Sequence, residues 1–86
     1  MQYILSKRFE KSFSKLNKKQ KEKAIEVFEI FIKNPADQIL NNHRLSGKWS
    51  EYRSINITGD LRAIYLSIDD NLVRFVDIGS HSKLYS

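Results

Sequence analysis

The second half of the chain alternates apolar and polar side chains, and this pattern limits the possible folds more than any other feature. Three short segments rich in β-branched and aromatic residues carry it, at 52–57, 61–68 and 72–78. Polar spacers of the kind found in hairpin turns separate them, at 58–60 and 69–71. We therefore expect three consecutive strands that pair antiparallel.

The alternation also sorts the side chains of the first strand into two faces. Ile55 and Ile57 are expected to point into the core. The residues expected on the opposite, polar face are Tyr52, Ser54 and Asn56. If helices cover only one face of the sheet, this polar face is a candidate working surface.

The first half of the chain has the helical period instead. After a short apolar segment at 1–5 that is suited to a strand, Ser6 can cap a first helix. Asn17 followed by Gln20 is the pattern of a capping box, so a second helix should begin there and end near Asn34, where a proline follows. The expected inner faces are Phe9, Phe13 and Leu16 in the first helix, and Ala24, Ile25, Phe28, Phe31 and Ile32 in the second.

Together these elements predict an α+β domain with the order β-α-α-β-β-β. Two N-terminal helices would pack on one face of a small antiparallel sheet. The connection at 36–49 has no clear period and is expected to be mostly loop. A chain of 86 residues, 41% of them hydrophobic, can build one small core, so we expect residues 1–86 to form a single domain.

Composition bears on location and partners. The chain has no cysteine, its apolar stretches are too short to span a bilayer, and its first residues lack the apolar run of a secretory signal. We therefore expect a cytoplasmic protein with no membrane partner. The net charge is +5, and residues 7–23 hold eight Lys or Arg against two Glu. This balance favours contact with polyanions.

Several kinds of chemistry have little support in the sequence. The two histidines stand far apart, and no spacing of histidines and carboxylates is typical of a metal site. Neither a serine-nucleophile turn nor a glycine-rich phosphate loop is present. We therefore expect no metal and no cofactor.

Metal-free acid/base chemistry on RNA remains. RNA supplies its own nucleophile, the 2′-OH, so cleavage needs a base, an acid for the leaving 5′-oxygen, and cations around the phosphate. His81 and His43 can transfer protons near neutral pH, and Arg53, Arg62 and Lys48 can supply positive charge.

Each of these residues also has a purely structural interpretation. Both histidines could be exposed loop residues, and the helix lysines a solvated face. Arg53 and Arg62 could be held in ion pairs within the fold. The carboxylates available for this are Asp60 and Asp77. Tyr85 could close the edge of the core, and the single tryptophan could do the same.

Ordered motifs in the second half of the chain favour the chemical interpretation. They are H-x-L-x-G-x-W at 43–49, Y-R at 52–53, G-D-L-R-A-I-Y at 59–65 and D-I-G-S-H-S-x-L-Y at 77–85. In this order they resemble the RelE-like ribosome-associated endoribonuclease toxins of bacterial type II toxin–antitoxin pairs, and among these the YafQ branch.

The resemblance implies a RelE-like fold and a toxin that enters the ribosomal A site and cleaves mRNA there without a metal, leaving a 2′,3′-cyclic phosphate. It also implies a cognate antitoxin that wraps the toxin and represses their shared operon, with a heterotetramer as one form of the complex. Because this chain is basic, we expect the antitoxin to be acidic.

The resemblance also implies roles for individual residues. His81 would be the leading proton-transfer residue, and Tyr85 would orient or stack on a base. His43 and Asp60 match positions that assist acid/base chemistry. Arg62 matches an arginine near the scissile phosphate.

This chain departs from the YafQ pattern at two positions. It has Asn56 where a further histidine is common, and Leu61 where a tryptophan follows the turn aspartate. Asn56 can bind RNA through hydrogen bonds, as Lys48 and Arg53 can through charge, but it cannot transfer a proton near pH 7. The alternative function is therefore a non-catalytic or decayed RNA- or ribosome-binding module of the same fold.

Overall fold

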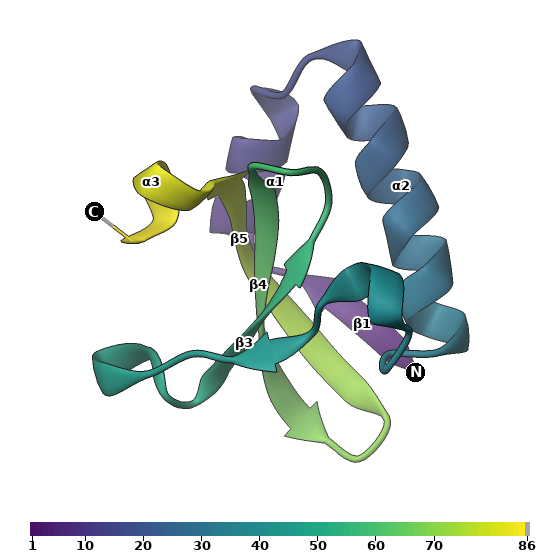
Figure 1. The fold of residues 1–86 in the computed structure, drawn as a ribbon, viewed down its shortest axis with the longest axis vertical. Coiled ribbons are helices and arrows are strands. Elements are labelled where there is room, and N and C mark those ends of the chain that lie inside the picture. The colour runs from purple at the N-terminus through teal and green to yellow at the C-terminus, as the bar shows by residue number, and fades with distance from the viewer. Residues whose placement is uncertain (86) are drawn as a thin grey trace.

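The computed structural model describes residues 1–85, and of Tyr85 only the backbone. The α+β class is confirmed (Figure 1). The strands are β1 (Gln2–Leu5), β2 (His43–Arg44), β3 (Tyr52–Asn56), β4 (Leu61–Asp69) and β5 (Leu72–Ser80). The helices are α1 (Lys7–Ser14), α2 (Lys18–Lys33) and α3 (His81–Tyr85), with 3₁₀ turns η1 (Gln38–Leu40) and η2 (Gly47–Trp49). None of the helices within residues 1–85 has the length and apolar character needed to cross a membrane.

The sheet is mixed, in the order β1-β5-β4-β3-β2. The predicted hairpins are present, because β3 pairs with β4 and β4 with β5, both antiparallel. The expectation of a purely antiparallel sheet was wrong for β1, which runs parallel to β5 with Gln2 opposite Leu72. Turn residues determine only the pairs that a turn joins, so the partner of β1 had no local signal.

The connection at 36–49 holds more regular structure than expected. It contains η1, the two-residue strand β2 and η2. β2 pairs antiparallel with β3, with His43 opposite Ser54. Two residues are too few to show an alternating pattern, so this strand was not predicted.

Both predicted helix starts are confirmed. The Ser6 hydroxyl accepts a hydrogen bond from the Phe9 amide at 3.0 Å and donates one to the Val76 carbonyl at 2.9 Å, so it caps α1 and joins it to β5. Asn17 and Gln20 form the expected capping box of α2, with bonds of 2.8 and 3.0 Å.

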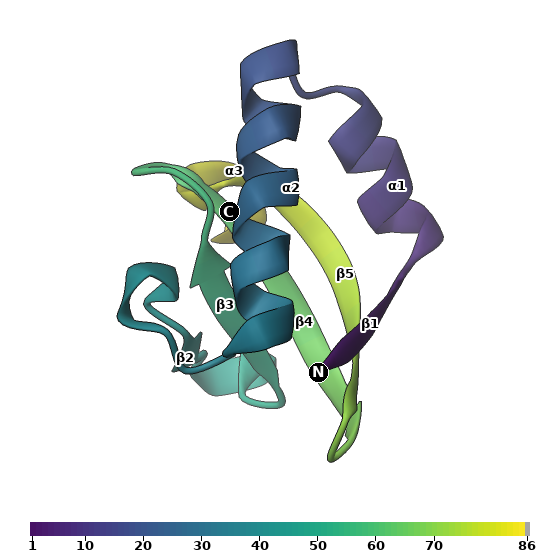
Figure 2. The ribbon, with the colours of Figure 1, turned by 90° about the vertical axis from the view of Figure 1, so that its right-hand side faces the viewer.

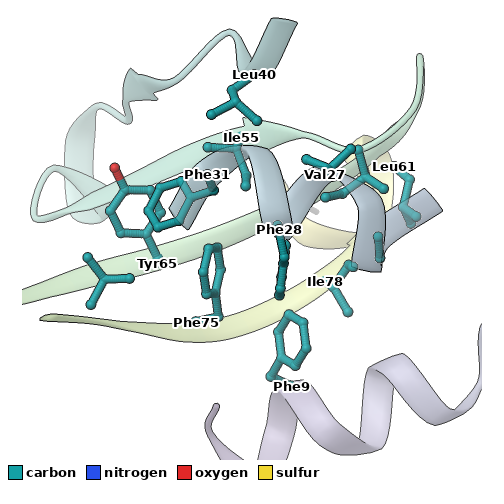
Figure 3. Packing of buried hydrophobic residues seen from close by; sticks show 14 residues of the cluster. Phe9, Val27, Phe28, Phe31, Leu40, Ile55, Leu61, Tyr65, Phe75 and Ile78 are labelled. Carbon is teal, nitrogen blue, oxygen red and sulfur yellow. The ribbon is translucent and has the colours of Figure 1, made fainter. Parts of the chain in front are cut away.

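The core lies between α2 and one face of the sheet (Figures 2 and 3). Phe28 stacks on Phe75 with ring centroids 4.4 Å apart, and Phe31 packs edge-on against Tyr65 at 5.2 Å. The predicted α2 stripe was too broad, because Ile25 is 55% and Ile32 41% exposed. The residues of α2 that are buried are Ala24, Val27, Phe28 and Phe31. They form a narrow stripe, since the sheet meets only one side of the helix.

The opposite face of the sheet, which we call the outer face, is partly covered by α3. Figures 1 and 2 show α2 and α3 on opposite sides of the sheet. Leu84 of α3 is 8% exposed and shares a hollow with Ile64 of β4 and with Trp49. The chain after β5 therefore packs on the outer face of the sheet.

Candidate functional site

Three side chains with predicted chemical roles meet on the outer face. They border a hollow of about 340 Å³, which we call the histidine hollow. Its lining residues are His43, Leu45, Ser46, Trp49, Arg62 and His81. These residues come from β2 and the turn after it, from β4 and from the start of α3. The fold thus brings together two histidines that are far apart in the sequence.

The His43 ring is oriented by a backbone bond. Its Nδ1 lies 2.8 Å from the carbonyl oxygen of Asn41. Asn41 has φ 44° and ψ 47°, in the left-handed region that asparagine adopts more readily than most residues. This conformation lets the chain turn at the end of η1 so that its carbonyl meets the ring two residues later.

His81 is placed by the turn between β3 and β4. Its backbone N–H donates to the Asp60 carbonyl at 3.1 Å, which fixes the start of α3 beside that turn. Gly79 lies two residues before His81, and a glycine is needed there only if the tail approaches too closely for a Cβ. A Cβ at this position would lie 3.5 Å from the Lys83 side chain, an ordinary contact, so the approach does not require glycine.

Arg62 lies on the outer face opposite Asn56. Its Nη1 donates to the carbonyls of Thr58 at 3.0 Å and Gly59 at 2.9 Å. Arg62 therefore holds the β3–β4 turn and contributes a positive charge to the histidine hollow.

The polar face of β3 is less open than expected. Ser54 is fully buried, and the larger side chains of His43 in β2 and Ile64 in β4 lie directly opposite it on either side. Its hydroxyl and the Asn56 Oδ1 are buried without a hydrogen-bond partner among the described residues. Asn56 lies beside the histidine hollow through its pairing with Arg62.

The remaining predicted residues lie outside the hollow or outside the described residues. Asp60 is exposed and borders a neighbouring hollow with Lys15 and Ser80, and its backbone carbonyl accepts the hydrogen bond from the His81 N–H. Lys48 is exposed in η2, next to the hollow-lining Trp49. The Tyr85 side chain lies outside the described residues.

Arg53 is not brought to the histidine hollow. Its Nε donates to Asn42 Oδ1 at 2.8 Å, and it borders a separate hollow of about 420 Å³ with Asp37 and Asn42. The suggested ion pair between Asp77 and a strand arginine was also wrong. Asp77 pairs with Arg8 of α1 at 3.1 Å and accepts from the Ser12 hydroxyl at 2.7 Å.

Sequence reasoning missed part of the site's surroundings. The Trp49 ring borders the hollow and packs edge-on against Tyr52, with centroids 5.5 Å apart. Asn41 and Asn42 lie in the segment expected to be loop, although the Asn41 carbonyl bonds to the His43 ring and the Asn42 amide oxygen accepts from Arg53. The pair of asparagines before His43 was the sequence signal for this turn, because asparagine adopts the left-handed conformation more readily than most residues.

The family model described as "Bacterial toxin of type II toxin-antitoxin system, YafQ" matches residues 1–86. No curated protein matches the sequence.

Solved structures extend the similarity to three dimensions. The crystal structure of YafQ from E. coli strain BL21(DE3) has 26% identity and a TM-score of 0.81, covering 98% of this chain and 97% of that chain. YafQ in the E. coli DinJ–YafQ toxin–antitoxin complex has 26% identity and a TM-score of 0.78, covering 98% and 96%. The Mycobacterium tuberculosis RelBE2 complex includes a chain with 17% identity and a TM-score of 0.76, covering 93% and 96%, which shows the shared fold.

Proposed function

This chain belongs to the YafQ family of toxins of bacterial type II toxin–antitoxin systems, and on that premise we propose that it is a metal-independent mRNA endoribonuclease. It would act in the cytoplasm, on mRNA in the ribosomal A site, and so inhibit translation. The reaction would be a transesterification in which the 2′-oxygen attacks the adjacent phosphorus and the 5′-oxygen leaves.

The observation that carries the proposal is the meeting of His43, Arg62 and His81 around one hollow. This chemistry needs two proton-transfer groups and a cation beside the phosphate. Two imidazoles can supply the first requirement. The hydrogen bonds of Arg62 within the described residues all involve Nη1, so its Nε and Nη2 are available to donate to a further acceptor.

The surroundings of the hollow suit single-stranded RNA. Trp49 presents an aromatic ring at the border, and stacking of a base on such a ring contributes about 1–3 kcal/mol. The basic segment 7–23 adds a positive field that favours approach to the ribosome.

Induced expression tests the function directly. We expect growth and translation to stop, with new 5′ ends on a reporter mRNA that fall at fixed positions within codons, because cleavage in the A site follows the reading frame. Primer extension on the reporter, with incorporation of labelled amino acids measured in parallel, provides the readout. Normal growth with uncut mRNA would rule the proposal out, and arrest without cleavage would favour the RNA- or ribosome-binding module.

A partner can be proposed for a second surface. A hollow of about 330 Å³ lies between β1, α1 and α2, and we call it the apolar groove. Leu5, Ile25 and Ile32 border it and are all more than a third exposed. The helices beside it include the strongly basic segment 7–23.

We propose that an acidic amphipathic segment of the cognate antitoxin occupies the apolar groove. Its apolar side chains would cover the exposed isoleucines, and its carboxylates would face the lysines of α1 and α2. The E. coli relative is found in a complex with its antitoxin DinJ. A segment that is disordered when free and folds on the toxin is expected.

The groove can be tested by substitution. Ile25→Asp should weaken antitoxin binding about 10- to 100-fold, because burial of an isoleucine contributes roughly 1.5–3 kcal/mol and each 1.4 kcal/mol is tenfold. Ile68→Asp is the matched control, since Ile68 is also exposed but lies in β4 away from the groove. Isothermal titration calorimetry with the product of the adjacent gene gives both affinities, and a salt titration should weaken binding. Equal effects of the two substitutions would show that the antitoxin does not bind in the apolar groove. Binding that is insensitive to salt would show that the partner segment is not acidic.

A further inference from the structure

Asn42 is the centre of a hydrogen-bonded cluster that we call the Asn42 clamp. Its Nδ2 donates to the Pro35 carbonyl at 3.0 Å and to the Tyr65 hydroxyl at 2.8 Å. Its Oδ1 accepts from Arg53 Nε at 2.8 Å, and its backbone carbonyl accepts from Arg53 Nη2 at 3.3 Å. Both hydrogens of the amide and its oxygen therefore have partners.

The clamp is anchored in rigid parts of the fold. The Tyr65 ring is buried between Phe31 and Phe75, with centroids 5.2 and 5.4 Å away, so its hydroxyl has a fixed position (Figure 3). Arg53 lies opposite Tyr65 in the adjacent strand β3. The backbone of Asn42 is consequently held against two inner strands.

This anchoring determines the position of the next residue. His43 begins β2 and lines the histidine hollow, while the clamp borders the separate hollow near Asp37. On the other side of Asn42, Asn41 places its carbonyl oxygen 2.8 Å from His43 Nδ1. The short loop therefore fixes both the backbone and the ring of His43.

The bond to Asn41 also determines the tautomer of His43. A carbonyl oxygen can only accept a hydrogen bond, so Nδ1 must carry the hydrogen. In the neutral ring the lone pair is then on Nε2. Nε2 is the nitrogen that remains to receive a proton from a substrate.

We propose that Asn41 and the Asn42 clamp are positioning residues that make His43 Nε2 the general base of the cleavage reaction, which leaves His81 as the general acid. The inference rests on the proposed function and adds an assignment of the two proton-transfer roles. Arg53 and Tyr65 act through Asn42 and do not contact the RNA.

Two proton transfers accompany the proposed cleavage. His43 Nε2 takes the proton of the 2′-OH as the 2′-oxygen forms a bond to phosphorus. The bond between phosphorus and the 5′-oxygen breaks, and this oxygen receives a proton from the His81 imidazolium. The products are a 2′,3′-cyclic phosphate and a free 5′-OH, with one proton moved from His81 to the RNA and one from the RNA to His43.

The tautomer can be measured without activity. At pH values at which the His43 ring is neutral, long-range ¹H–¹⁵N spectra of the free protein should show a protonated Nδ1 and an unprotonated Nε2. Asn42→Ala should abolish this preference, and Tyr65→Phe, which keeps the ring in the core, should reduce it. Asn71→Ala, in the exposed β4–β5 turn, should leave it unchanged. A protonated Nε2 in the wild type would overturn the inference, as would an unchanged tautomer in folded Asn42→Ala.

The two roles can be separated with a modified mRNA. Replacing the bridging 5′-oxygen at the cleaved phosphate by sulfur gives a leaving group that needs no acid. On ribosome-bound mRNA with oxygen, His43→Ala and His81→Ala should each lose about 10²- to 10⁴-fold in rate. With sulfur, His81→Ala should recover to near the wild-type rate, whereas His43→Ala and Asn42→Ala should not recover.

The outcomes distinguish the two proposals. If the wild type cleaves neither mRNA, the proposed function fails. If the wild type cleaves and sulfur restores His43→Ala in place of His81→Ala, the function stands and the assignment of base and acid is reversed.

Discussion

Replacing His81 with glutamine is expected to lower the single-turnover rate of mRNA cleavage about 10²- to 10⁴-fold, the usual contribution of one acid/base group. Glutamine keeps hydrogen-bonding capacity but cannot transfer a proton near neutral pH. Since the His81 backbone bond to Asp60 is unaffected, α3 should keep its place. Cleavage is measured on saturating programmed ribosomes, and ribosome affinity, measured separately, should barely change.

Substitutions of Tyr85 provide the comparison. If its ring stacks on a base, Tyr85→Phe should retain most of the activity, and Tyr85→Ala should lose about 1–3 kcal/mol of binding. A mild effect of His81→Gln together with a severe loss in Tyr85→Phe would assign proton transfer to the phenol. Circular dichroism and an unchanged melting midpoint are required of each variant, because losing one or two kcal/mol in a small domain can mimic a catalytic defect.

Replacing Arg62 with alanine should lower the cleavage rate about 10²- to 10³-fold, the loss found when one preorganised donor to a developing charge is removed. The guanidinium borders the same hollow as both histidines, and the reaction concentrates negative charge on the phosphate. Single-turnover rates on programmed ribosomes again provide the measurement, with the effect in the rate and little change in ribosome affinity.

Arg74→Ala is the matched control for this loss of charge. Arg74 is an exposed arginine of a neighbouring strand, opposite Leu66, and does not border the histidine hollow. Equal losses in the two variants would mean that general attraction to RNA, not placement beside the phosphate, explains the effect. Because Arg62 also bonds the Thr58 and Gly59 carbonyls, urea unfolding must show that the Arg62 variant is still folded at the assay temperature.

Features specified by neighbouring residues could be predicted from the sequence. Ser6 and Asn17 each cap a helix through a residue three positions later, so their signals are complete within one turn. The hairpins of β3, β4 and β5 likewise depend on the short polar spacers between them. The parallel pairing of β1 with β5 depends on tertiary packing alone, and it was missed.

The faces of the strands were harder to predict. Arg53 and Arg62 both have an apolar residue two positions later, and in a strand this spacing places both arginines on the same face as that residue. The prediction from spacing that this face is the core side held for Arg53, because Ile55, two residues later, lies in the main core. It failed for Arg62, because Ile64 is buried on the outer face, where Leu84 of α3 shares its hollow. When both faces of a sheet are covered, an apolar side chain no longer shows which side of its strand faces the main core.

The site itself was only partly predictable. The ordered motifs suggested that His43 and His81 work together, but no spacing rule places residues of β2 and α3 around one hollow. The role of the Asn41 carbonyl could not be foreseen, since it depends on one left-handed backbone conformation. Trp49 was expected only to pack, and it does so while also bordering the hollow.

The pairing of β1 with β5 affects when the protein can fold during its synthesis. β1 is synthesised long before β5, its partner in the sheet, so this pair cannot form until the codons for 72–80 have been read. His81 follows immediately, and it joins the hollow only once β5 has brought it beside β4. The long separation in sequence between β1 and β5 therefore delays formation of the histidine hollow until residues 72–81 have left the ribosome. If the proposed function is right, a nascent chain that has not yet formed the β1–β5 pair cannot cleave the mRNA on its own ribosome.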